Sequence, residues 1–175
     1  MAKKKADRQD VIEHLGGLIR GIKVAMMTTV EQDGSLRSRP MWTHDRDFDG
    51  ELWFFTKEHS PKVDEVEHDH HVSLAYSDPT KDRYVSVSGR CRLVLDKDKA
   101  RELWNPTLKA WFPEGLEDPE LALLRVSVEK AEYWDTPNSR MVQLAGFVKA
   151  TLTGQEYRPG DNEKVTLDQG GASIH

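Results

Sequence analysis

Two hydroxyls and an ammonium group follow an aromatic stretch of the chain at a spacing that suits anion binding. Segment 53–62 reads WFFTKEHSPK, so Thr56 ends the aromatic run, and Ser60 and Lys62 follow a short loop. Ser60-Pro61 is typical of a helix start, where free backbone N–H groups and the helix dipole favour an anion. The segment therefore fits a phosphate monoester. The alternative is that Ser60 only caps the helix and that Lys62 is a surface residue.

Two arginines and a proline lie upstream in the segment 37–42, which reads RSRPMW. Arg37 and Arg39 are in strand register, two residues apart. Proline cannot donate to a ladder, so Pro40 indicates an edge or an opening where the backbone faces something else. A flat ligand ring whose edge meets free main-chain groups fits such an opening. The alternative is an edge strand that proline and charge protect from further pairing.

Six strands are predicted around these two segments, because β-rich runs alternate with turn signals such as Asp33-Gly34 and Asp49-Gly50. The strands are expected at 24–30, 36–44, 52–56, 71–77, 84–95 and 121–134. Helices are expected at 7–22, from Ser60-Pro61 onward, at 96–103 and at 139–152. Ser88-Gly89 is a weak point suited to a bulge or a close backbone approach. This order predicts a mainly β fold, an antiparallel barrel with flanking helices and not a βαβ sheet.

Composition points to one domain over residues 1–175, with a core at about 7–152 and a polar tail at about 153–175. The formal net charge is −5, which disfavours nucleic-acid and membrane-surface partners because both need clustered positive potential. The basic run 3–5 is interpreted as a solvated tail. The single cysteine, Cys91, and the lack of an apolar signal segment predict a cytoplasmic protein.

The order and spacing of the motifs resemble the FMN-binding split-barrel superfamily that includes pyridoxamine 5′-phosphate oxidase, and within it the general stress protein 26 branch. The resemblance runs from about residue 19 to residue 152. Its components are Arg39-Pro40-Met41, Phe55-Thr56, Ser60-x-Lys62, the strand at 84–89, Trp111-Phe112-Pro113 with Gly115, and Glu132-Tyr133-Trp134. It implies a six-stranded antiparallel split β-barrel that binds FMN at the seam of a homodimer.

Each motif implies a role for its residues toward the flavin. Arg39, Pro40 and Met41 are expected to line the isoalloxazine and ribityl chain, and Phe55 and Thr56 to meet the flavin. Ser60 and Lys62 are expected to hold the phosphate. Four aromatic residues are expected to close the pocket from the partner subunit: Tyr84, Trp111, Phe112 and Trp134. The tryptophans can stack on a planar ring, but core or dimer-interface packing is the alternative for Trp104, Trp111 and Trp134.

Three departures from the oxidase pattern affect the expected activity. Pro61-Lys62 stands where the oxidase has an arginine-lysine pair, and His44 stands where it has a lysine near the substrate phosphate. The C-terminal arginine-bearing segment of the oxidase is also missing. The flavin site is therefore expected to be intact, whereas oxidation of pyridoxamine phosphate is not expected.

The leading hypothesis is an FMN-dependent oxidoreductase that acts on an unknown small substrate with a small-molecule redox partner. No catalytic residue can be named; His44 and Arg39 are the nearest candidates for acid–base work. One alternative is a non-catalytic protein that sequesters or senses flavin under stress. Another is a related split barrel that binds a different flavin, haem or a deazaflavin.

Three other constellations are given a structural interpretation. The cluster of His68, His70 and His71 beside acidic residues is interpreted as solvated surface and not as a metal site, because its members straddle a helix-to-strand junction. No G-x-S-x-G nucleophile elbow occurs in the sequence. Cys91, between two arginines, is interpreted as a buried and inert thiol.

Overall fold

Antiparallel strands are the main secondary structure of this computed structural model, which describes residues 8–44, 46–135, 161–168 and 171–174. The strands are β1 (Val24–Val30), β2 (Leu36–Trp42), β3 (Glu51–Lys57), β4 (His71–Asp78), β5 (Arg83–Val94), β6 (Leu121–Asp135), β7 (Asp161–Asp168) and β8 (Gly171–Ile174). The helices are α1 (Arg8–Ile19), α2 (Pro61–His68) and α3 (Lys97–Leu103), with short 3₁₀ helices η1 (Pro106–Ala110) and η2 (Gly115–Glu117).

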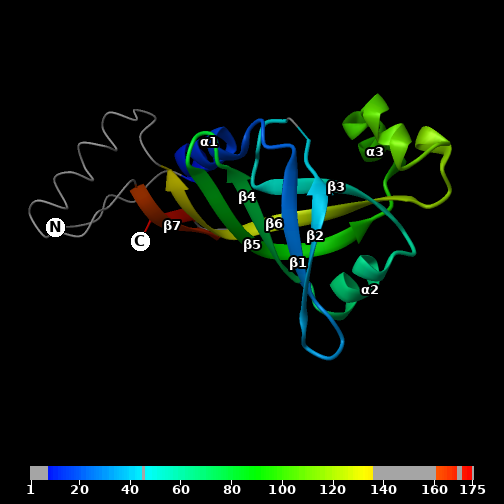
Figure 1. Cartoon of the computed structure of the whole chain (residues 1–175), viewed down its shortest axis with the longest axis horizontal. Helices are drawn as coiled ribbons and strands as arrows, with labels where there is room; N and C mark the ends of the chain where they lie inside the picture. Colours follow the sequence, from blue (N-terminus) through cyan, green and yellow to red (C-terminus); the bar gives the residue numbers. More distant parts are fainter. Residues whose placement is uncertain (1–7, 45, 136–160, 169–170, 175) are drawn as a thin grey trace, which may run out of the picture.

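The sheet has the order β2-β1-β4-β5-β6-β7-β8, and β3 pairs separately with β6. Strand β6 is shared: its residues 121–127 pair with β3, and its residues 130–135 pair with β7. The sheet curls so that β2 and β3 come into contact, but no ladder joins these two described strands. The barrel is therefore open between β2 and β3 (Figure 1).

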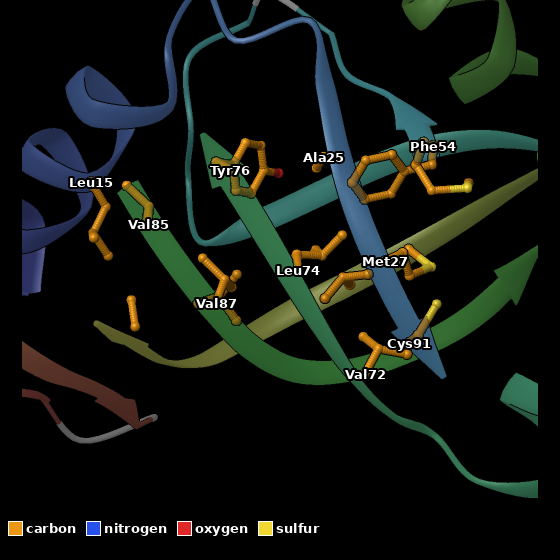
Figure 2. Close-up of a cluster of buried hydrophobic side chains, with 14 of the residues drawn as sticks. Leu15, Ala25, Met27, Phe54, Val72, Leu74, Tyr76, Val85, Val87 and Cys91 are labelled. Carbon is orange, nitrogen blue, oxygen red and sulfur yellow. The ribbon is translucent and has the colours of Figure 1, made fainter. Parts of the chain in front are cut away.

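The core fills the inside of the curled sheet with side chains at alternate strand positions. In β1, Ala25 and Met27 are buried while Val24 and Met26 are exposed, as expected for a strand with one covered face. Figure 2 shows Met27, Phe54 and the other inward side chains meeting between the strands. Burial of each large side chain contributes about 1.5–3 kcal/mol, so the core holds the strands on both sides of the opening in place.

Gly89 lies where the backbone of β6 approaches β5 closely, and the pairing register shifts between Ser88 and Gly89. A Cβ atom at Gly89 would lie 2.1 Å from the carbonyl oxygen of Ser127, which is closer than real contacts allow. Both parts of the prediction for this position, a bulge and a close backbone approach, are confirmed. Glycine is required here because there is no room for a side chain, and not because the backbone adopts a left-handed conformation.

The helices close the ends of the barrel. Figure 1 shows α1 and α2 at opposite ends of the curled sheet, with α3 beside the start of β6. Helix α2 contacts β1 and β5, and α1 contacts β5. Among the residues that the structure describes, no helix combines the length and apolar character that a bilayer crossing requires.

The six predicted strands are all present, with ends that differ by at most two residues from the expected ones. The first helix ends at Ile19 and not at Ile22, and Gly21 has a left-handed backbone conformation just beyond it (φ 82°). The predicted helix at 139–152 lies outside the described residues.

The expectation of a polar tail without strands after residue 153 is wrong for two segments, because β7 and β8 extend the sheet there. The segment 161–168 reads DNEKVTLD, and its only apolar residues, Val165 and Leu167, are both buried. Pairing with the second half of β6 supplies the backbone hydrogen bonds of β7. Two apolar residues in a polar segment were too weak a signal to predict the strand.

Candidate functional site

A cavity of about 250 Å³ lies at the opening between β2 and β3. Its lining residues are Val24, Pro40, Met41, Trp42, Phe55, Lys62, Leu108, Trp111 and Phe112. Strand β2 is at the end of the sheet order and, of the described strands, pairs only with β1, so Pro40 breaks no second ladder there. The opening predicted from Pro40 is therefore present. The edge-strand alternative is also correct, because this edge forms one wall of the cavity.

Four aromatic side chains line the cavity: Trp42, Phe55, Trp111 and Phe112. The rings of Trp42 and Trp111 have centroids 5.7 Å apart, and Phe55 and Phe112 are 6.2 Å apart. Trp104 packs edge-on against Phe55 at 5.8 Å. Phe112 is buried, whereas Trp111 is 51% exposed and Trp42 is 41% exposed. A slot with flat aromatic walls that is open on one side suits a planar ring system.

The polar end of the site is built by the loop between β3 and α2. Ser60 is at the N-cap of α2, but its side chain makes no capping hydrogen bond. Its hydroxyl lies 3.2 Å from Thr56 Oγ1 and accepts from Lys62 Nζ at 3.3 Å. The alternative in which Ser60 only caps the helix is therefore excluded. Lys62 is half-buried and not a fully exposed surface residue. Its pKa is lowered, mainly by burial and to a lesser extent by the charge of Arg39.

Arg39 brings a second cation to the polar end. Its Nη2 donates to Glu65 Oε2 at 2.5 Å, and its other terminal nitrogen, Nη1, is buried without a hydrogen-bond partner among the described residues. Burial alone would raise the pKa of Glu65. The hydrogen bonds from Thr29 and Arg39, with the charges of Arg39 and Arg37, outweigh burial and hold that pKa below its usual range.

The polar end has the properties of an anion site. Two cations lie close enough to affect each other, one buried donor has no partner in the described part of the chain, and two hydroxyls lie beside the start of α2. A buried donor without a partner costs roughly 1–3 kcal/mol, and an anion that accepts from it removes this cost. The donors present therefore fit a phosphate monoester.

The structure brings together most of the site residues expected from the sequence. Those around the cavity and its polar end are Arg39, Pro40, Met41, Phe55, Thr56, Ser60, Lys62, Trp111 and Phe112. We expected Trp111 and Phe112 to come from a partner subunit, but both line the cavity of their own chain. Tyr84 and Trp134 lie apart from this cavity, opposite each other on β5 and β6, and are 41% and 39% exposed.

Sequence reasoning missed three contributors: Trp42, Glu65 and Thr29. Trp42 is two positions from Pro40, so strand alternation could have placed both on the same side of β2. Glu65 follows Lys62 by three residues on α2, so the two share one side of the helix. The burial of Thr29 and Glu65 carried no sequence signal, because polar residues are usually exposed.

The other candidate chemistry lies outside the cavity. The rings of His44 and Phe55 pack together with their centroids 5.3 Å apart, and Nε2 of His44 is buried without a described partner. Burial, followed by the charge of Arg46, lowers the pKa of His44 and favours the neutral ring. Cys91 is buried, as expected, and burial raises its pKa to about 12. In the described ranges, no group of three or more His, Cys, Asp or Glu side chains is arranged to hold a metal.

Comparison with known proteins identifies the family. The sequence matches the pyridoxamine 5′-phosphate oxidase-like family over residues 10–158. The chain belongs to this family. Protein bli-3 of Neurospora crassa is 31% identical over 154 residues, which cover 82% of this chain and 74% of that protein.

Solved structures related to this pyridoxamine 5′-phosphate oxidase-like chain share its fold. A protein of Jannaschia sp. CCS1 assigned as general stress protein 26 superposes with a TM-score of 0.74 at 23% identity, covering 91% of this chain and 99% of that one. The general stress FMN/FAD binding protein of Xanthomonas citri superposes with a TM-score of 0.64 at 29% identity, covering 75% and 92%. The predicted split β-barrel is confirmed, and so is the predicted resemblance.

Proposed function

We propose that this protein binds FMN, with the phosphate at Arg39, Lys62 and Ser60 and the ring system in the aromatic cavity. The observation that carries the proposal is the buried Nη1 of Arg39, which has no hydrogen-bond partner among the residues described and lies close to the half-buried ammonium of Lys62. Two cations in one partly buried place repel each other unless an anion lies between them. Lys62 and four aromatic side chains line the same cavity, so one ligand can place its phosphate at the ammonium and its ring system among the aromatic residues.

Relatives support a flavin as the ligand. The Xanthomonas citri protein is described as FMN/FAD binding, and it shares 29% of its residues with this chain. The distinction between FMN and FAD is part of our proposal. It rests on the phosphate group: Lys62, Ser60 and Thr56 lie together in a single compact set of donors, as a terminal phosphate requires.

We also propose a homodimer with the flavin at the subunit interface. Apolar side chains are exposed on the outer face of the sheet: Val24, Met26, Trp42, Tyr84 and Trp134. Met26, Ala75, Ser86 and Glu132 form one cross-strand row on this face. Val24, Tyr84 and Trp134 each lie two residues from a member of that row, and Trp42 pairs with Val24, so all of them point to the same side of the sheet. Such an outer face is typical of a surface covered by a partner.

Sedimentation of the flavin-bound protein tests the dimer. We expect a dimer in the wild type, and dissociation in Trp134→Glu because a charge would be buried at the interface. A matched control is Leu95→Glu, which changes an exposed apolar residue outside this face. A wild-type monomer that still binds flavin tightly would contradict the shared site.

The proposed activity is that of a flavin-dependent oxidoreductase with a small substrate. Bound FMN would supply the acceptor and donor of electrons, and the chain's own residues hold the phosphate, orient the ring and exclude water from one side. The aromatic wall of Phe55 and Phe112 excludes water, while the half-exposed Trp111 and Trp42 leave one side accessible.

A second candidate function is flavin binding without turnover, as in a sequestering stress protein. One observation favours it: Lys62 is the one titratable group among the described residues that line the cavity. His44 lines a different cavity, and Arg39 is anchored to Glu65. Among the described residues of one protomer, no side chain at the ring is therefore evident as a general acid or base. Direct hydride transfer needs no such side chain.

An absorbance spectrum of the purified protein tests flavin binding, and mass identification of the heat-released ligand tests FMN. We expect a yellow protein that releases FMN. A colourless protein that does not bind added FMN would overturn the proposal. Anaerobic mixing with NADH or NADPH then separates the two functions. Rapid bleaching supports the oxidoreductase, and bleaching by dithionite alone supports the non-catalytic protein.

A further inference from the structure

The buried carboxylate of Glu65 has a place in this site that flavin binding alone does not assign. We propose that Glu65 is a positioning residue for phosphate recognition: it anchors the Arg39 guanidinium so that Nη1 is left for an anion, and it offsets the repulsion between Arg39 and Lys62. This inference rests on the proposed function, because it concerns how the same site holds the phosphate of FMN.

Glu65 reaches Arg39 from the helix that also carries Lys62. Its Oε2 atom accepts from Thr29 Oγ1 and from Arg39 Nη2, and both distances are 2.5 Å. Thr29 is fully buried on β1, and Glu65 is only 7% exposed. The carboxylate is thus held by donors from β1 and β2, and α2 itself packs against β1 and β5.

This anchoring fixes the direction of the rest of the guanidinium group. Arginine presents its N–H donors in a rigid plane, so holding Nη2 also determines where Nη1 points. Nη1 is buried and without a partner among the described residues. A buried donor of this kind is uncommon in native proteins and calls for a partner beyond the described residues. The anion proposed for Lys62 and Ser60 supplies that partner.

The surrounding charges give Glu65 a second effect. Arg37 Nη1 lies 3.5 Å from Glu65 Oε1 and 3.6 Å from Glu31 Oε1, so its charge is shared between two carboxylates. The charge of Arg39 lowers the pKa of Lys62, whereas the charge of Glu65 raises it. Glu65 therefore helps to keep Lys62 protonated beside Arg39, in the form that binds a phosphate.

A purely structural ion pair between α2 and β2 is the competing explanation, and a charge-preserving variant distinguishes the two. Glu65→Asp keeps the negative charge but withdraws it by one methylene group, which breaks the contact with Arg39. We expect the affinity for FMN to fall by about tenfold while that for riboflavin, which has no phosphate, changes less than about twofold. The matched control is Glu67→Asp, on the exposed side of the same helix.

A double-mutant cycle tests whether Glu65 acts through Arg39. In an Arg39→Ala background, Glu65→Asp should change the affinity for FMN by less than about twofold, because there is no guanidinium left to position. An undiminished effect of Glu65→Asp in that background would overturn the inference. Equal weakening of FMN and riboflavin by Glu65→Asp in the wild-type background would also overturn it, in favour of the structural ion pair.

Glu65→Gln keeps the reach of the side chain and tests the charge, and it decides the matter if Glu65→Asp does not fold. With the carboxylate charge removed, Lys62 should lose its proton at lower pH. The alkaline loss of FMN affinity should therefore begin at lower pH than in the wild type, while riboflavin binding stays flat. An unmoved midpoint would overturn the inference. A wild-type chain that binds no FMN would instead refute the proposed function.

Discussion

The two ends of the candidate site are built in different ways. At the polar end, Arg39 and Glu65 have side chains only 15% and 9% exposed, and a network that includes Thr29 fixes them. At the ring end, contacts between aromatic rings hold the walls, and Trp111 is half-exposed. At the polar end the buried charges are paired within one chain, and one Arg39 donor is left over, whereas the ring end is open to the outside.

The difference follows from the groups involved. Buried charges must be paired within the fold, because each unpaired charge costs several kcal/mol. The Arg39–Glu65 pair therefore has to be formed before any ligand binds, and only Nη1 of Arg39 is left for the anion. Apolar walls carry no such requirement, and a ring or a second subunit can cover the exposed indole faces later. We infer that the polar end selects the phosphate and that the ring end contributes affinity for any flavin. The predictions below test this division.

Arg39→Ala should have the largest effect, because it removes a cation from the polar end and leaves Glu65 buried. We expect FMN to bind about a hundredfold or more weakly relative to riboflavin. Stability should fall by about 3 kcal/mol, since the half-exposed Arg37 compensates only partly for the lost partner. Titration with both flavins and urea denaturation measure the two effects. An unchanged preference for FMN would place the phosphate elsewhere.

Lys62→Ala combined with Ser60→Ala should weaken FMN by about ten- to a hundredfold, because charge-assisted hydrogen bonds of about 1.5–3 kcal/mol are lost. Riboflavin should bind almost as before, since the double variant leaves the aromatic walls intact. Neither residue belongs to the hydrophobic core, so the fold should be retained. Equal weakening of the two ligands, measured by fluorescence quenching, would remove the phosphate assignment.

The sequence predicted the fold through signals that are local. Turn dipeptides and alternation located all six expected strands, and the Ser88-Gly89 weak point marked the place where Ser127 approaches. Strand β7 was missed because its identity depends on a partner, the second half of β6, and not on its own polar sequence. Pairing that is decided by a distant strand leaves little trace in the segment itself.

The sequence predicted those parts of the site in which the chemically active residues are close together in the chain. Ser60-x-Lys62 and Arg39-Pro40-Met41 are compact motifs, and the structure brings both to one place. Glu65 could not be found in this way. An acidic residue in the opening turns of a helix is common on dipole grounds alone. Its function depends on Thr29 and Arg39, which are on other elements and contact it only after folding.

The pH dependence of binding separates the two ends without disturbing the fold. Burial and the charge of Arg39 lower the pKa of Lys62 in the free protein. FMN affinity should therefore be full from about pH 7, where the phosphate is a dianion, up to that lowered pKa, and should decline as the pH rises through it, at a lower pH than an exposed lysine would give. Riboflavin affinity should stay flat. Lys62→Arg should remove the alkaline decline, because a guanidinium stays protonated there. A decline that persists in Lys62→Arg would assign the titration to another group.

Trp111→Ala should have the smallest effect and should act on both ligands alike. The indole is half-exposed, and its ring centroid lies 5.7 Å from that of Trp42. It therefore offers one face for stacking and no group for the phosphate. Loss of a stacked aromatic contact of about 0.5–1.5 kcal/mol weakens binding by about two- to tenfold. FMN and riboflavin should lose the same factor, whereas Leu95→Ala, at an exposed position outside the cavity, should change neither. A selective loss of FMN in Trp111→Ala would mean that the two ends are coupled and that the division between them fails.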